Sequence, residues 1–345
     1  MLSETRDGET RVALTPGLVG KVKAKGYEVV IEKGAGVRAG HADDAYTEAG
    51  AEILPTAAAV TAAADILLRV QVPTEAELGA LREGTTLLAH LWPLQRHELV
   101  KKLAAKKVTS FSMDMVPRIT RAQAMDSLSA MSTVAGYKAT LLAAAELGRF
   151  CPMLMTAAGT IRPSKALVLG AGVAGLTAIG TLRRLGAVVE AFDVRPAVKE
   201  QVQSLGAKFV EFTVDDAEDK GGYAKALDDD QQARQLELIH KHIKDANIVI
   251  TTALIPGRKA PVLVTEAMLK DMHDGSVVVD LAAIQHYYFA FALCNQLAFH
   301  APLAAPPPDS DYMMNLRWCT ETNLYAIEAL AEMLQVRLQE VPIPA

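Results

Sequence analysis

The sequence predicts an α/β protein with two doubly wound parallel sheets, joined by a long linking helix. Short apolar runs alternate with helical segments over most of residues 15–281. That alternation is typical of a mostly parallel sheet with helices on both faces. A glycine-rich turn at 170–175 directly follows one apolar run and opens a helix. The 345 residues suffice for two domains, which we place at about 1–120 and 121–300.

The first half alternates helices and strands in order. Thr15 and Pro16 suit the N-cap and first turn of the first helix, which Gly26 ends. The expected helices span 15–25, 43–48, 56–64, 75–82 and 96–107, and the expected strands span 27–31, 51–54, 66–70, 85–91 and 108–112. A sheet of this kind usually opens with a strand before its first helix. Here the first residues look like the loop after such a strand, so we expect the first strand to be missing.

A long linking helix is expected between the halves, over about 121–147. Apolar residues recur at helical spacing from Met125 onward. The first turn of this helix holds Arg121, Gln123 and Asp126, a polar cluster where two domains would meet. Two interpretations of the cluster stay open from the residues alone: a ligand site, or solvated charges at a capped helix start.

The segment 165–193 has the order of a dinucleotide-binding unit: strand, glycine turn, helix, second strand and terminal acid. Gly170 permits the tight turn out of the strand, Gly172 lets the backbone approach a pyrophosphate, and Gly175 allows the helix to pack closely on the strand. Asp193 can accept hydrogen bonds from the adenosine ribose, and its charge would repel a 2′-phosphate. The pattern therefore predicts a Rossmann-like domain that prefers NAD to NADP.

Two features after this unit keep two interpretations each. Arg195 could blunt the repulsion of a 2′-phosphate by contacting the cofactor, or it could be a solvated start to the next helix. The acidic loop at 215–225, with Gly222 and Tyr223, could be a mobile lid or a plain surface excursion. The remaining expected helices span 198–205, 230–244 and 266–272, and the remaining strands 209–212, 248–252 and 277–281.

Composition excludes several classes of function. A formal charge of −5 gives no electrostatic basis for binding nucleic acid. The three cysteines, Cys151, Cys294 and Cys319, lie far apart and indicate a reducing compartment, with neither a metal site nor a disulfide framework. The first residues are too polar for a signal peptide. No run of eighteen apolar residues predicts a membrane span.

Several sequence blocks occur in the order known from one family. Examples are RVALTPG (11–17), RITRAQAMD (118–126), GAGVAGL (170–176), GGYAK (221–225) and TTALIPG (251–257). Together they resemble the NAD(H)-binding α subunit of the proton-translocating NAD(P) transhydrogenases. The likeness covers roughly residues 3–283, and RITRAQAMD and GGYAK are far more specific than the glycine turn.

The resemblance implies a role for each matching residue. Arg118, Gln123, Asp126 and Ser129 would surround the nicotinamide of NAD(H), and the first three would be the catalytic set. The residues around the rest of the cofactor would be Gly170, Gly172, Val173 and Gly175 at the pyrophosphate, Asp193, Val194 and Arg195 at the adenosine ribose, Gly222 and Tyr223 in a mobile loop, and Leu254 at its border.

The implied reaction is direct hydride transfer from NADH to NADP⁺ held on a partner, coupled to proton movement across a membrane. The partners would be an NADP-binding β subunit, which alone carries NADP(H), and a membrane domain. Hydride transfer is the cofactor's own chemistry, so the protein needs to position the ring and no acid–base pair is required. The resemblance also implies a homodimer in the cytoplasm, held at the inner membrane through its partners. A closing helix at about 320–338 is expected to return to the first domain.

Two rival functions remain. An alanine dehydrogenase would use Arg11 and His90, but its expected lysine is Arg69 here and its expected downstream acid is Ile284. Arginine cannot give up a proton as a tuned lysine can. The other rival is a degenerate NAD-binding module without turnover, because residues 284–318 depart from the family pattern.

Overall fold

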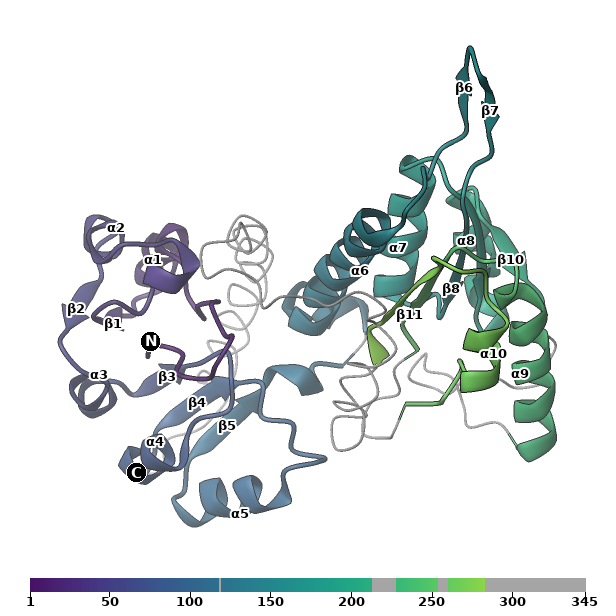
Figure 1. The fold of residues 1–345 in the computed structure, drawn as a ribbon. Coiled ribbons are helices and arrows are strands. Elements are labelled where there is room, and N and C mark those ends of the chain that lie inside the picture. Colours follow the sequence, from purple (N-terminus) through teal and green to yellow (C-terminus); the bar gives the residue numbers. More distant parts are fainter. Residues whose placement is uncertain (118, 213–227, 254–259, 283–345) are drawn as a thin grey trace. The chain divides into compact units, whose positions relative to one another are not determined.

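A computed structural model of the chain divides into two compact units (Figure 1), the first running from Met1 to Ala130 and the second beginning at Met131. Both units are α/β with parallel main sheets, as the sequence predicts. The residues that the structure describes are 1–117, 119–212, 228–253 and 260–282. The expected closing helix, the acidic loop and the divergent segment after Ala283 lie outside them.

The second unit is built around a five-stranded parallel sheet. Its strands are β8 (Lys165–Leu169), β9 (Val188–Phe192), β10 (Lys208–Val210), β11 (Ile248–Thr251) and β12 (Val277–Asp280). They lie in the order β10-β9-β8-β11-β12. The chain therefore moves from β8 to one edge and then crosses to β11 on the other side. In a sheet of this order, ligands bind outside the carboxyl ends of the two strands at the reversal, here β8 and β11.

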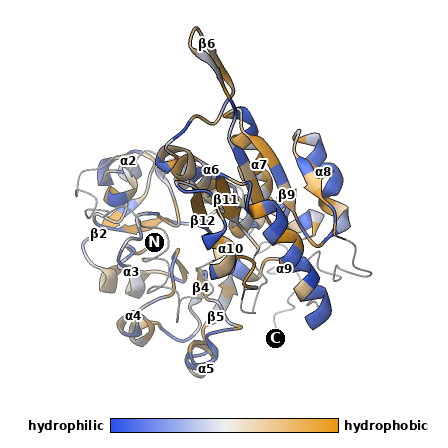
Figure 2. Ribbon diagram, turned by 45° about the vertical axis from the view of Figure 1, so that its right-hand side comes forward, coloured by the Kyte–Doolittle hydropathy of each residue, from blue (hydrophilic) through white to orange (hydrophobic). Residues whose placement is uncertain are grey.

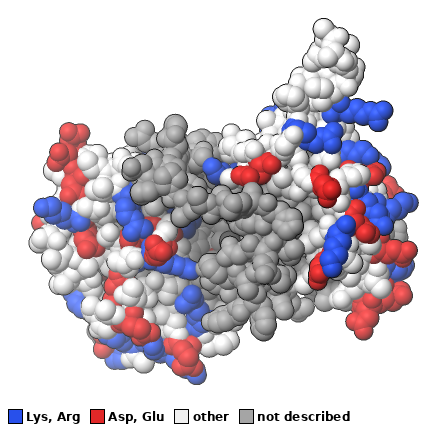
Figure 3. All heavy atoms as spheres, viewed as in Figure 1, with Lys and Arg blue, Asp and Glu red and all other residues white. Residues whose placement is uncertain are grey.

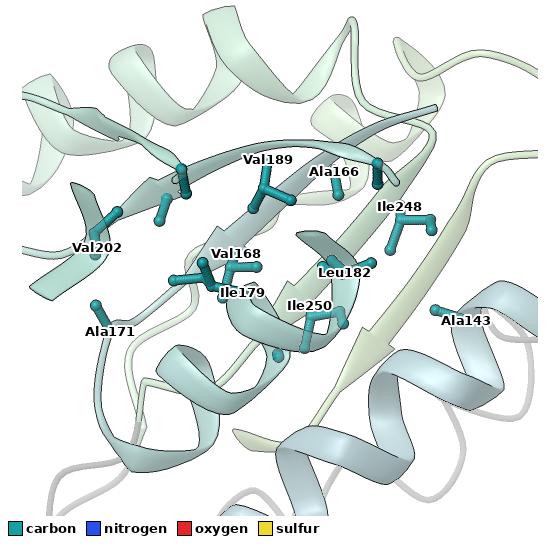
Figure 4. Close-up of a cluster of buried hydrophobic side chains, with 14 of the residues drawn as sticks. Ala143, Ala166, Val168, Ala171, Ile179, Leu182, Val189, Val202, Ile248 and Ile250 are labelled. Carbon is teal, nitrogen blue, oxygen red and sulfur yellow. The ribbon is translucent and has the colours of Figure 1, made fainter. Parts of the chain in front are cut away.

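Both faces of this sheet are covered, which explains why its strands are continuous apolar runs. Ala166 and Val168 of β8 belong to the core on one face, whereas Leu167 and Leu169 belong to the core on the other. The helices that cover the first face are α6 (Ser127–Glu146), α7 (Val173–Arg184) and α8 (Lys199–Ser204), and those that cover the second are α9 (Asp229–Ile243) and α10 (Glu266–Lys270). Figure 4 shows the first core, where side chains from α7 pack on those of β8 and β11.

The first unit contains two parallel sheets. Their strands are β1 (Val30–Glu32) with β2 (Glu52–Leu54), and β3 (Ile66–Leu68), β4 (Thr86–Ala89) and β5 (Thr109–Ser112) in that order. The helices are α1 (Pro16–Ala24), α2 (Asp43–Glu48), α3 (Ala57–Ala63), α4 (Glu75–Ala80) and α5 (His97–Ala105). Each lies within the range expected from the sequence. Thr74 and Glu77 form a capping box at the start of α4, which fixes that boundary.

The first residues correct one expectation. We expected them to form the loop after a missing strand, yet Met1 still takes part in sheet pairing. Its amine donates to the carbonyl oxygen of Val30 at 2.7 Å, and the amide of Glu32 donates to the carbonyl oxygen of Met1 at 3.0 Å. Leu2 is buried in the same core as Leu67 of β3. These residues therefore occupy the place of a strand beside β1.

The linking helix begins later than expected. Residues Thr120–Met125 form a 3-10 helix (η3), and α6 starts only at Ser127. The backbone of Asp126, at φ −77° and ψ 84°, separates the two because it is not helical. Further along α6, a Cβ on Gly136 would lie 2.1 Å from the carbonyl oxygen of Ala174. This close approach of α6 to α7 requires glycine.

A hairpin that the sequence did not predict projects from the second unit (Figure 1). It consists of β6 (Leu154–Thr156) and β7 (Gly159–Ile161), paired antiparallel. The strands have three residues each, and their Ala157-Ala158 turn lacks the Asn-Gly or Asp-Gly signal of a tight hairpin. Met155 on this hairpin is 80% exposed.

The two colour schemes agree with a water-facing surface over a buried sheet. In Figure 2, β11 and β12 are hydrophobic, whereas α9 combines hydrophilic and hydrophobic positions. On the face in Figure 3, acidic and basic side chains are interspersed over the described residues. None of the helices in the described part of the chain combines the length and apolar character needed to span a bilayer.

Candidate functional site

The glycine turn lies at the carboxyl end of β8, where the strand order reverses. Gly170 has φ +100°, a conformation that favours glycine, and a Cβ there would lie 2.7 Å from the Thr252 hydroxyl oxygen. A Cβ on Gly175 would lie only 1.8 Å from the carbonyl oxygen of Gly170. The two glycines thus permit the turn and the close packing of α7 on β8 that the sequence predicts.

Gly172 differs from its two neighbours because the space beside it is open. A Cβ at this position would meet no atom within 4 Å. Gly172 is the N-cap of α7, and no side chain caps the helix there. Amide groups at a helix N-terminus attract anions, since they lack partners within the helix and lie at the positive end of its dipole. The twelve-residue helix that begins at Val173 therefore presents an open anion-binding end.

Asp193 follows β9 and is 6% exposed. Its carboxylate accepts a hydrogen bond from the amide of Ala171 at 2.8 Å, which ties it to the glycine turn. Arg195 binds both carboxylate oxygens: its amide and Nε lie 2.9 Å from Oδ1, and its Nη2 lies 2.8 Å from Oδ2. The guanidinium is therefore an internal counter-ion of Asp193, and the interpretation of Arg195 as a solvated helix start is wrong. Val194 between them is buried.

Thr252 is a positioning residue that the sequence analysis did not single out. Its amide donates to the carbonyl oxygen of Leu169 at 2.7 Å, and its hydroxyl donates to the carbonyl oxygen of Gly170 at 2.9 Å. It thereby fixes the turn from the neighbouring strand β11. The signal that would have found it is its place directly after a strand at the reversal of the sheet.

In the first unit, the structure brings together two of the predicted nicotinamide residues. The Ser129 amide donates to Oδ1 of Asp126 at 2.9 Å, and the Ser129 hydroxyl donates to Oδ2 at 2.5 Å. Asp126 thus caps the first turn of α6. Gln123 is exposed on η3, and its carbonyl oxygen accepts from the Asp126 amide at 3.2 Å.

His90 lies at the carboxyl end of β4 and contacts the same first turn of α6. Its Nδ1 is 3.0 Å from the carbonyl oxygen of Val70, and its Nε2 is 2.8 Å from the hydroxyl oxygen of Ser127. The ring stacks on Trp92, with centroids 6.5 Å apart and planes 27° apart. Burial lowers the pKa of His90, so the neutral ring is favoured.

The arginines that an alanine dehydrogenase would need are already bound to carboxylates. Nε and Nη2 of Arg11 lie 2.8 and 2.6 Å from the Glu9 carboxylate. Arg69 is 3% exposed and pairs with both Glu4 and Glu77. These pairs neutralise both guanidiniums within the protein, so neither presents an uncompensated charge to a substrate carboxylate.

Four predicted site residues lie outside the described part of the chain, namely Arg118, Gly222, Tyr223 and Leu254. Ile284, the residue at the position of the dehydrogenase acid, also lies outside it. Among the residues that the structure does describe, no group of three or more His, Cys, Asp or Glu side chains could hold a metal ion.

The two-unit fold with an open glycine turn defines a class, and sequence comparison identifies it. Residues 1–135 match the model of the family described as alanine dehydrogenase/PNT, N-terminal domain, and residues 139–286 match that of the corresponding C-terminal domain. The chain belongs to this alanine dehydrogenase/PNT family.

Within the family, the chain is most like the transhydrogenase branch among the relatives compared. It is 50% identical over 289 residues to an NAD(P) transhydrogenase subunit alpha of Rhodospirillum rubrum, covering 81% of this chain and 75% of that protein. The alanine dehydrogenase of Mycolicibacterium smegmatis is 33% identical over 286 residues, or 82% of this chain and 71% of that protein. The expected resemblance to transhydrogenase α subunits is confirmed.

Solved structures agree with this placement. The crystal structure of a transhydrogenase from Sinorhizobium meliloti superposes with a TM-score of 0.77 at 39% identity, covering 98% of this chain and 93% of that one. An L-alanine dehydrogenase structure has a TM-score of 0.73 at 23% identity, covering 98% of this chain and 90% of that one, and shares the fold.

Proposed function

We propose that this chain is the NAD(H)-binding component of a proton-translocating NAD(P) transhydrogenase and passes hydride from NADH to NADP⁺ on a partner subunit. The observation that carries the proposal is the open N-terminus of α7 at Gly172, next to the buried carboxylate of Asp193. The 50% identity to a transhydrogenase α subunit supports this choice within the family.

The described residues fit a dinucleotide. The backbone of Gly172 and Val173 leaves room for a pyrophosphate at the end of the helix dipole, because no side chain fills that place. Gly170 and Gly175 shape the turn behind it. The adenosine ribose would lie at Asp193, Val194 and Arg195, where its hydroxyls must share or replace the contacts that Arg195 makes with the carboxylate.

The nicotinamide end would lie at Gln123, Asp126, Ser129 and Arg118. When bound, NADH supplies the hydride, so the residues of the chain need to orient and shield the ring. Asp126 is suited to orientation because two hydrogen bonds from Ser129 fix its carboxylate and leave lone pairs that can accept from an amide. Gly222, Tyr223 and Leu254 would close over the cofactor.

The partner in this proposal is an NADP-binding β subunit, which alone holds NADP(H), together with a membrane domain that moves protons. The chain would then sit on the cytoplasmic face of the inner membrane through these partners. An α subunit of Cereibacter sphaeroides named NAD(P) transhydrogenase subunit alpha is 50% identical over 283 residues, and the chain spans 54% of its length.

A homodimer completes the proposal, and the β6–β7 hairpin supports it. Met153, Met155 and Ile161 are 58%, 80% and 36% exposed. In Figure 3 the hairpin is free of charged residues. A two-stranded hairpin is marginal by itself, and so much exposed apolar surface favours burial by a second copy. Sedimentation should show a dimer that Met155→Asp weakens; a wild-type monomer at micromolar concentration contradicts it.

The function is tested by two measurements on the purified chain. Fluorescence titration should show tight binding of NADH and weak binding of NADPH, and a mixture with the NADP⁺-loaded partner subunit should transfer hydride. Binding without transfer would favour a degenerate NAD-binding module. Formation of alanine from pyruvate, ammonia and NADH would instead identify an alanine dehydrogenase, contrary to the neutralised Arg11 and Arg69.

A further inference from the structure

His90 joins two segments of the first unit that lie 37 positions apart in the sequence. The function proposed above assigns this residue no task. Its ring spans from the end of β3, at Val70, to the start of α6, at Ser127. Both contacts are short, and the Ser127 residue is only 3% exposed. The ring is therefore a buried link to the helix turn that carries Asp126.

The partners of His90 define which nitrogen carries the proton. The carbonyl oxygen of Val70 can only accept a hydrogen bond, so Nδ1 must be the protonated nitrogen. In a neutral ring Nε2 is then an acceptor, and the Ser127 hydroxyl must donate to it. The buried ring favours this neutral form. The contact thus fixes the orientation of both the imidazole and the serine hydroxyl.

The loop that carries the ring is itself held rigidly. Trp92, which stacks on His90, has φ +53°, a strained conformation for a bulky residue. The amides of Leu91 and Trp92 donate to Oδ1 of Asp114 at 2.9 and 3.2 Å, and this carboxylate also accepts from the Ser112 hydroxyl at 2.5 Å. A loop fixed in this way can hold a neighbouring group in place.

We infer that neutral His90 is a positioning residue for the nicotinamide end of the site, acting through Ser127 on Asp126 and Ser129. Ser127 lies between these two residues in the first turn of α6, where Asp126 binds the Ser129 amide and hydroxyl. Loss of the acceptor at Nε2 releases this turn and moves the Asp126 carboxylate relative to the ring. The inference rests on the proposed transhydrogenase function.

The test uses two amide replacements that separate the two ring nitrogens. His90→Gln places an oxygen where Nε2 lies, so it can still accept from Ser127. His90→Asn places its amide nitrogen near the position of Nδ1, so it can still donate to Val70 but leaves Ser127 without its acceptor. Hydride transfer to partner-bound NADP⁺ should fall roughly 10- to 100-fold in His90→Asn and only several-fold in His90→Gln. The NADH dissociation constant should stay within a few-fold in both.

Ser127→Ala supplies an independent arm. It should lower hydride transfer as much as His90→Asn does, and the double variant should lose no more than either single variant, because both remove one contact. If His90→Asn does not fold by circular dichroism, the rates of Ser127→Ala and the hydroxyl-retaining Ser127→Thr decide the question. Threonine should keep most of the transfer rate.

The failures of the two proposals are distinguishable. A wild-type chain that binds NADH but transfers no hydride with its partner contradicts the proposed function, whatever the variants do. A wild-type chain that transfers hydride, with His90→Asn and Ser127→Ala at the same rate, overturns the positioning role alone. Equal losses in His90→Asn and His90→Gln, matched by equal losses of thermal stability, would also overturn it by showing a purely structural histidine.

Discussion

The glycine turn of the second unit and the Asp126 turn of the first are built in different ways. Around the glycine turn, absent side chains make the geometry: Gly170 and Gly175 have no room for a Cβ, and Gly172 leaves open space. Around Asp126, side chains make the geometry through hydrogen bonds from Ser129 and through the link from His90 to Ser127. The first construction should fail by steric clash, and the second by small displacements.

The largest effects are expected from a matched pair of glycine substitutions. Gly175→Ala should lower the free energy of unfolding by about 3 kcal/mol, because its Cβ would lie 1.8 Å from the carbonyl oxygen of Gly170. Gly172→Ala should leave stability nearly unchanged, yet weaken NADH roughly tenfold or more, about 1.4 kcal/mol, because the methyl group enters the open space. Urea denaturation and NADH titration measure the two effects. Equal stability losses in the two variants would contradict the division of roles.

The same difference explains what the sequence could predict. The unit from β8 to Asp193 is local, and each part has its own signal in consecutive residues, so its fold and its three glycine conformations were predictable. The link between His90 and Ser127 was not, because no pattern relates residues 37 positions apart. The Arg195 pairing stayed open for a simpler reason. An arginine two residues beyond an acid can face solvent, a ligand or that acid, and only the backbone direction decides.

Boundaries were less predictable than elements. The break between η3 and α6 depends on one residue, Asp126, whose side chain caps the helix from outside it. Apolar spacing continues through the break and therefore gave a single helix from about residue 121. The β6–β7 hairpin was missed because Ala157 and Ala158 carry no turn signal.

A second prediction concerns the side-chain construction directly. Gln123→Asn keeps the amide but shortens its reach by one methylene on the exposed η3 helix. If Gln123 acts when the two nicotinamides come together, hydride transfer should fall roughly 100-fold, as expected for a misplacement near 1 Å, and the NADH dissociation constant should change only a few-fold. Stopped-flow transfer to the NADP⁺-loaded partner measures this. A wild-type rate would leave Gln123 as a solvated residue at a helix start.

The third prediction tests the ion pair at the ribose position. Asp193→Ala removes the charged acceptor and should weaken NADH roughly tenfold or more, about 1.5–3 kcal/mol. It also leaves the Arg195 guanidinium without its main carboxylate partner, so NADPH should bind better than it does to the wild type. Arg195→Ala is the matched control, since the carboxylate remains and the preference for NADH should persist or grow. Unchanged NADPH affinity in Asp193→Ala would remove Asp193 from the discrimination.

The smallest effect is expected from acid titration of the first unit, whose side-chain network contains Glu9. Burial alone would raise the pKa of this carboxyl, but hydrogen bonds from Arg11 and Gln71 outweigh it and lower the pKa from 4.5 to about 2. The folded state therefore binds the proton more weakly than the unfolded state. The stabilisation by the Glu9 charge is present above about pH 4.5 and is lost as the pH falls through about 2.

Glu9→Gln measures this contribution because it keeps the size of the side chain and removes its proton uptake. Between pH 4.5 and 2 the free energy of unfolding of the wild type should fall more steeply than that of Glu9→Gln, by up to about one proton in the linkage slope. The chain has two tryptophans, and Trp318→Phe leaves Trp92 as the single fluorescence reporter in the first unit. Urea titrations in that background at several pH values give the two slopes. Parallel slopes would mean that Arg11 and Gln71 do not stabilise the charged form of Glu9, and that the network around it contributes packing alone.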